Sequence, residues 1–139
     1  MRIVEIPRYL DDKGLDAVAD AIGAWPPQER LLFDARATKW SSPYGFVGLL
    51  TAGQALAEIK AETPRLAVPD LDEVRSYWAK AGFFKHAAEF FDLVGKVPRR
   101  AADESSDVLV PVRPIRNMDD VHSLVEGLGE RVSRMLTEE

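Results

Sequence analysis

The most informative segment of the chain is Leu31-Leu32-Phe33-Asp34, followed after a short loop by Ser42-Pro43-Tyr44-Gly45-Phe46. A short apolar run that ends at an acid is typical of a strand buried on both faces of a sheet. Ser42 suits a helix N-cap because its hydroxyl accepts an orphan backbone N–H, and Pro43 suits the first helical position because its missing N–H costs nothing there. The stretch therefore predicts a buried strand, a loop, and a helix that begins at Pro43 and packs against a sheet.

The flanking segments continue this alternation of strands and helices. Before the central stretch we expect a strand within residues 2–9 and a helix over residues 13–25, which the Pro26-Pro27 pair ends. After it we expect a strand at 65–68, two helices within 70–91 that Gly82 separates, a loop at 95–107, an edge strand at 108–112 and a helix over 117–136. This order predicts a single α/β domain with a small mixed sheet of four to five strands and helices packed against it.

Length and charge exclude several classes of protein. A chain of 139 residues is the size of one domain with its own core, so we assign residues 1–139 to a single domain. The net charge is −5, and Lys and Arg are interspersed with acids, which argues against a nucleic-acid partner held by phosphate neutralisation. No stretch approaches the roughly 18 apolar residues of a membrane span, and no long apolar leader is present. We therefore expect a cytoplasmic protein that does not bind a membrane.

Residues that could carry chemistry are few. The chain has no cysteine and two histidines, His86 and His122, without the spacing of a metal-binding motif, so we expect no metal and no cofactor. Ser42 follows a strand and precedes a helix, but it lacks the flanking glycines of a nucleophile elbow, and a helix cap explains it better. We expect no enzymatic activity. An enzyme that uses Asp34 as a base together with Ser42 stays open as a third interpretation.

Aromatic residues suggest where a partner would bind. Six of them lie between residues 77 and 91 at helical spacing, and we expect most of these, about four of the six, to be core. Trp40 is different because it stands in a polar loop between strand and helix, where a large ring is hard to bury. Trp is frequent among interface hot spots, so Trp40 is a candidate anchor for a partner, and a half-buried packing role stays equally open.

The central stretch resembles the core signature of STAS domains, the family of anti-sigma-factor antagonists. In that family a strand carrying an Asp leads through a loop to an Asp-Ser-Ser-Gly-Leu type of turn at the start of a helix, and Asp34 and Gly45 match that spacing. A short strand at 66–68, followed by a helix that ends in Ala81-Gly82-Phe83, is similar to the family's next element. The resemblance covers about residues 30–84.

The resemblance implies a small α/β domain with a central mixed sheet and no catalytic activity. It also implies a partner, a GHKL-type (histidine-kinase-like) ATPase or an anti-sigma factor, in a partner-switching pathway that regulates transcription. Family members are switched by phosphorylation of a Ser or Thr at the helix start. Ser42 falls where the family usually has Asp, Pro43 where the phosphorylated residue lies, and Tyr44 where a small residue is usual. Because proline cannot accept phosphate, Ser41 or Ser42 would have to replace the usual acceptor.

Two functional hypotheses follow from these residues. The first is a docking surface for a protein partner, made by Trp40, Ser41, Ser42, Pro43, Tyr44 and Gly45. The alternative is a small-molecule sensor with a pocket near the strand-to-helix turn at residues 34–45, at the carboxyl ends of the strands. The identity of the partner and the oligomeric state stay open.

Overall fold

Four short parallel strands form the main sheet, in the order β1 (Arg2–Glu5), β3 (Leu31–Asp34), β5 (Arg65–Ala67) and β6 (Asp92–Val94). The computed structural model describes residues 1–97, 122, 126, 130 and 133. A separate two-stranded ribbon pairs β2 (Tyr9–Leu10) with β4 (Trp40–Ser41), also in parallel. The prediction of an α/β domain is confirmed, but every described strand pair is parallel, whereas a mixed sheet was expected.

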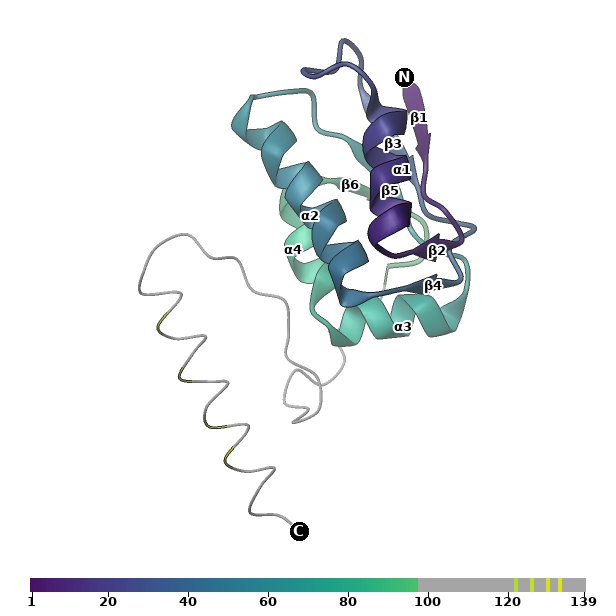
Figure 1. The fold of residues 1–139 in the computed structure, drawn as a ribbon, viewed down its shortest axis with the longest axis vertical. Coiled ribbons are helices and arrows are strands. Elements are labelled where there is room, and N and C mark those ends of the chain that lie inside the picture. The colour runs from purple at the N-terminus through teal and green to yellow at the C-terminus, as the bar shows by residue number, and fades with distance from the viewer. Residues whose placement is uncertain (98–121, 123–125, 127–129, 131–132, 134–139) are drawn as a thin grey trace.

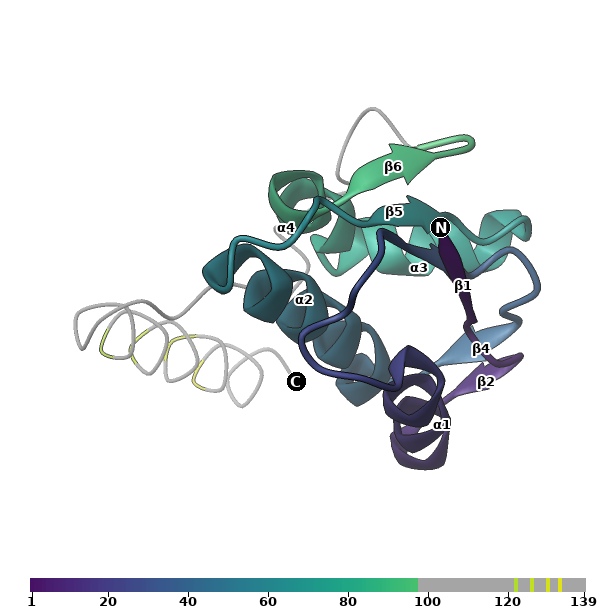
Figure 2. The same ribbon diagram turned by 90° about the horizontal axis from the view of Figure 1, so that it is seen from above.

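Four helices connect the strands: α1 (Asp12–Ile22), α2 (Pro43–Glu58), α3 (Asp72–Lys80) and α4 (Phe83–Phe90). The strands are added to the sheet in chain order, so right-handed crossovers place their connections on one face. Figure 1 looks onto this face, with α1 and α2 side by side in front of the strands and α3 across the lower end. Figure 2 shows α1 and α2 from above, together on one side of β5 and β6.

The helix-covered face of the sheet forms the core. Val4, Phe33 and Leu66 are neighbours across β1, β3 and β5, and all three are fully buried. Phe33 packs edge to face against Phe91, with ring centroids 5.7 Å apart. Burial of each such side chain stabilises the fold by about 1.5–3 kcal/mol. On the opposite face Ile3 is 60% exposed, so the described helices cover only one side of the sheet.

The helical hairpin of α3 and α4 supplies most of the aromatic core. Gly82 separates the two helices with a φ of 81°, a conformation that glycine adopts without strain. The rings of Trp78 and Phe83 pack at a tilt of 56° with their centroids 4.6 Å apart, and Phe84 and Phe91 are also buried. The prediction of two helices broken at Gly82, with most of the six aromatic residues in the core, is therefore confirmed.

Several element boundaries differ from the sequence prediction. The expected strand within residues 2–9 is divided between β1 and β2, and β4 and β6 were not predicted. The predicted strand at 108–112 lies outside the described residues, as does most of the predicted helix over 117–136. The four positions described there are helical and exposed: His122, Glu126, Glu130 and Ser133. Among the helices that the structure describes, none is both long and apolar enough to cross a membrane.

Helix α2 begins as the sequence predicted. Ser42 is its N-cap, and the Ser42 Oγ accepts a hydrogen bond from the Gly45 N–H at 3.1 Å. Pro43 occupies the first turn. Gly45 is needed there for a different reason: a Cβ on this residue would lie 2.2 Å from the Leu10 carbonyl oxygen. The first turn of α2 therefore rests directly on the backbone of β2 at Leu10.

We expect Gly45→Ala to lower the free energy of unfolding by about 1–3 kcal/mol, because the added methyl overlaps backbone that cannot move aside. Gly48→Ala is the matched control in the same helix. Its added Cβ would meet only the outer atoms of the Leu15 side chain, which can rotate away. Urea denaturation of both variants tests this, and equal losses of stability would contradict it.

Candidate functional site

The β2–β4 ribbon fixes the loop between β3 and α2. The backbone N–H groups of Lys39 and Trp40 donate to the Arg8 carbonyl oxygen at 2.8 and 3.1 Å. The Ser42 N–H donates to the Leu10 carbonyl oxygen at 3.0 Å. The loop that carries Trp40 is thus held by backbone hydrogen bonds, to which the buried Thr38 hydroxyl adds one by donating to the Pro7 carbonyl oxygen at 3.1 Å.

One face of the ribbon is aromatic and exposed. Tyr9 and Trp40 are direct neighbours across the ribbon, and they are 62% and 51% exposed. Leu10 and Ser41, the next pair, are buried, as expected from the alternation of side chains along a strand. Tyr44, in the first turn of α2, is 65% exposed. Three large aromatic side chains are therefore open to solvent around the junction of β2, β4 and α2.

The six residues predicted to bind a partner divide into two groups. Trp40, Pro43 and Tyr44 are exposed. Ser41 is only 4% exposed, and its hydroxyl donates to the Ser42 carbonyl oxygen at 2.9 Å. Gly45 is buried against β2, and Ser42 is partly buried as the cap of α2. Fewer of the six residues are therefore available to a partner than the sequence predicted. The exposed surface also includes Tyr9, which the sequence did not indicate.

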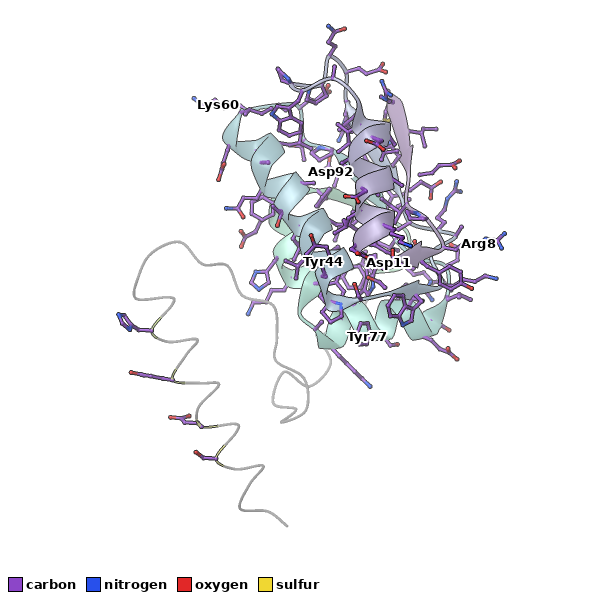
Figure 3. All side chains as sticks on the ribbon, viewed as in Figure 1. Arg8, Asp11, Tyr44, Lys60, Tyr77 and Asp92 are labelled. Atoms are coloured by element: carbon purple, nitrogen blue, oxygen red, sulfur yellow. The ribbon has the colours of Figure 1, made fainter. Side chains whose placement is uncertain are left out.

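A hollow of about 290 Å³ lies between β4 and α3. Its lining is Lys39, Trp40, Ser41 and Pro43 on one side, and Glu73, Val74 and Tyr77 on the other. Figure 3 shows Tyr77 below the first turn of α2, where Tyr44 lies. The three residues from α3 were not predicted as site residues, because only the tertiary fold brings α3 against β4.

The carboxyl edge of the sheet holds a charge pair. The Arg36 Nε and a terminal guanidinium nitrogen each donate to the Asp34 carboxylate at 2.9 Å. These hydrogen bonds hold the pKa of Asp34 below its ordinary value. A hollow of about 280 Å³ at this edge is lined by Asp34 and Arg36 together with Glu5, Ile6, Ala37 and Asp70. Asp34 pairs with Arg36 and Ser42 with Gly45, so the two residues of the enzymatic interpretation have separate partners.

No metal site is apparent in the part of the chain that the structure describes, where no three His, Asp or Glu side chains gather closely enough to hold an ion. Comparison of the sequence with protein-family models gave no match, and searches of curated proteins and of solved structures gave none either. The resemblance to STAS domains therefore rests on the sequence motifs within residues 30–84 alone.

We expect Ser42→Ala to lower the free energy of unfolding by about 1 kcal/mol, since the Gly45 N–H loses its side-chain acceptor and keeps only the Ser42 carbonyl oxygen at the start of α2. Ser42→Asp is the matched variant, because an Asp carboxylate caps a helix as well as a serine hydroxyl does. Thermal or urea unfolding of the two variants measures the difference. If Ser42→Asp is destabilised as much as Ser42→Ala, the cap is not the reason that serine is needed at this position.

We expect Arg36→Met to raise the pKa of Asp34 toward its ordinary value of 3.8. Because Arg36 depresses that pKa in the folded state, the pair stabilises the fold above about pH 4, and this contribution is lost as the pH falls through the folded pKa. NMR titration of the Asp34 carboxyl carbon measures the shift, with Arg8→Met as a control. An unchanged pKa in Arg36→Met would show that the hydrogen bonds do not persist in solution.

Proposed function

We propose that this domain is a non-enzymatic, cytoplasmic regulatory module that binds a protein partner through the exposed end of the β2–β4 ribbon and the first turn of α2. The observation that carries the proposal is the exposed in-register pair of Tyr9 and Trp40, with Tyr44 close by in the sequence. Trp and Tyr are enriched among the residues that dominate binding energy at protein interfaces. We define these three residues as the docking surface.

The rigidity of the backbone beneath these rings favours docking. The Trp40 N–H donates to the Arg8 carbonyl, and the following helix is capped by Ser42. A side chain presented from a fixed backbone loses less conformational entropy on binding than one carried by a loose loop. The exposed aromatic area is therefore available for binding with little reorganisation of the domain.

The resemblance to STAS domains supports a particular class of partner, a GHKL-type ATPase or an anti-sigma factor. Pro43 occupies the position of the usual phosphate acceptor, so we propose that docking is constitutive unless Ser41 or Ser42 is modified. Ser42 is the more accessible of the two serines. A phosphate on Ser42 would lie at the positive end of the α2 dipole and would add up to about two negative charges next to Tyr44.

An affinity capture from native lysate, with mass spectrometry of the captured proteins and of the Ser41-Ser42 peptide, tests this proposal. We expect a GHKL-type ATPase or an anti-sigma factor to be recovered with the unaltered chain. Trp40→Ala and Tyr44→Ala should each weaken binding of that purified partner at least about tenfold, which is a typical loss for an interface hot spot.

Trp25→Ala is the matched control, because Trp25 is 50% exposed, close to the exposure of Trp40, but lies in the loop before β3. It should leave partner binding unchanged. Equal losses in Trp25→Ala and Trp40→Ala would contradict the docking surface. Reproducible capture without any ATPase or anti-sigma factor would contradict the class of partner.

A further inference from the structure

The hollow between β4 and α3 carries opposite charges on its two walls. Lys39, a basic residue next to β4, and Glu73, an acidic residue in the first turn of α3, both line the hollow. Both residues are exposed. Neither forms an ion pair with any described residue, including the other. Because these two oppositely charged residues line the same hollow without forming an ion pair, a ligand that carries both charges can pair with each of them.

Apart from Ser41, the rest of the lining is apolar or aromatic. Trp40 and Tyr77 come from β4 and α3, and Val74 is a buried residue of α3. The faces of Trp and Tyr rings attract alkylated ammonium groups through the ring quadrupole. A nearby carboxylate attracts the same group by its charge. The Glu73 side of the hollow therefore suits a cationic group with alkyl substituents, and Lys39 suits an anionic group.

We propose that this hollow binds a small zwitterion, an ammonium carboxylate of the amino-acid or betaine class. The carboxylate of the ligand pairs with Lys39, and its ammonium group lies against Glu73 and the rings of Trp40 and Tyr77. A hollow of about 290 Å³ is close to the lower end of the range for small-molecule sites, which limits the ligand to a compact molecule. Neither wall alone would distinguish a zwitterion from a simple cation or a simple anion.

This site goes beyond the proposed docking function and does not depend on it. Trp40 is the only residue that the hollow shares with the docking surface defined above. The experiment uses no protein partner, so its failure would leave the docking proposal untouched, and a failure to find a protein partner would leave this site untouched.

Four probes of closely related size test the contribution of each charge to binding separately. Glycine betaine and L-valine are zwitterions with a trimethylated and a primary ammonium group. Choline keeps the trimethylammonium group without a carboxylate, and 3,3-dimethylbutyrate keeps the carboxylate and the branched alkyl group without the positive charge. Titration of the 139-residue chain, followed by the NMR shift of the Trp40 indole N–H, gives the affinity for each. Trp40→Phe assigns that signal, because Trp25 and Trp78 remain.

We expect at least one zwitterion to bind about tenfold or more tightly than both choline and 3,3-dimethylbutyrate, since each missing charge loses a charge-assisted contact. Comparison of betaine with valine shows which ammonium type the site prefers. Lys39→Met should reduce the zwitterion's affinity to that of choline, and Glu73→Gln should reduce it to that of the butyrate. Lys13→Met, an exposed lysine on α1 away from the hollow, should change neither.

Two outcomes would overturn the proposal. One is an affinity for both zwitterions no greater than for choline or 3,3-dimethylbutyrate. The other is tight zwitterion binding that Lys39→Met and Glu73→Gln leave unchanged, which would place the ligand elsewhere. Both variants replace exposed charges that have no described ion-pair partner, so a loss of folding would not obscure the result.

Discussion

The carbonyl oxygen of Leu10 is the point on which the arrangement of the site depends. It accepts a hydrogen bond from the Ser42 N–H at 3.0 Å and lies at 3.4 Å from the Ser42 hydroxyl. Because Gly45 has no Cβ, the first turn of α2 can settle on the same oxygen. The N-terminal segment, the ribbon and the longest described helix thus meet at one backbone group. Together with the hydrogen bonds of Lys39 and Trp40 to the Arg8 carbonyl, this contact positions the backbone of Trp40 and Tyr44 on either side of Ser42.

The parts of the fold that the sequence predicted well have strong local causes. Ser42 and Pro43 define a helix start by hydrogen bonding and by a fixed φ, and Gly82 defines a break because its φ of 81° suits glycine. Strands of two or three residues, such as β2, β4 and β6, are too short to show a period. The parallel direction of the strands was also missed, because it follows from the crossovers and not from any single segment.

The residues of the candidate site also fall into those that local sequence predicted and those that only the tertiary fold brings together. The exposure of Trp40 follows from its polar surroundings in the sequence, but its neighbour Tyr9 comes from a strand far away in the chain. Ser41 and Gly45 were included because they adjoin Trp40 and Tyr44 in sequence, whereas alternation along β4 and close packing of α2 bury them. Glu73 and Tyr77 join the site only because α3 packs beside β4, and no local pattern carries that information.

The topology explains why the proposed functions lie at the ribbon and not at the carboxyl edge of the sheet. In doubly wound sheets the ligand crevice forms where the strand order reverses and helices diverge to opposite faces. The order β1-β3-β5-β6 contains no reversal among the described strands. At the carboxyl edge, moreover, Asp34 is satisfied by Arg36 and Asp72 by Arg75. Lys39 and Glu73 line the hollow between α3 and β4, which pairs with β2 outside the main sheet, and neither forms an ion pair with any described residue. The exposed rings of Tyr9 and Trp40 on the ribbon, and the charges of Lys39 and Glu73 beside it, are therefore available to a ligand or a partner.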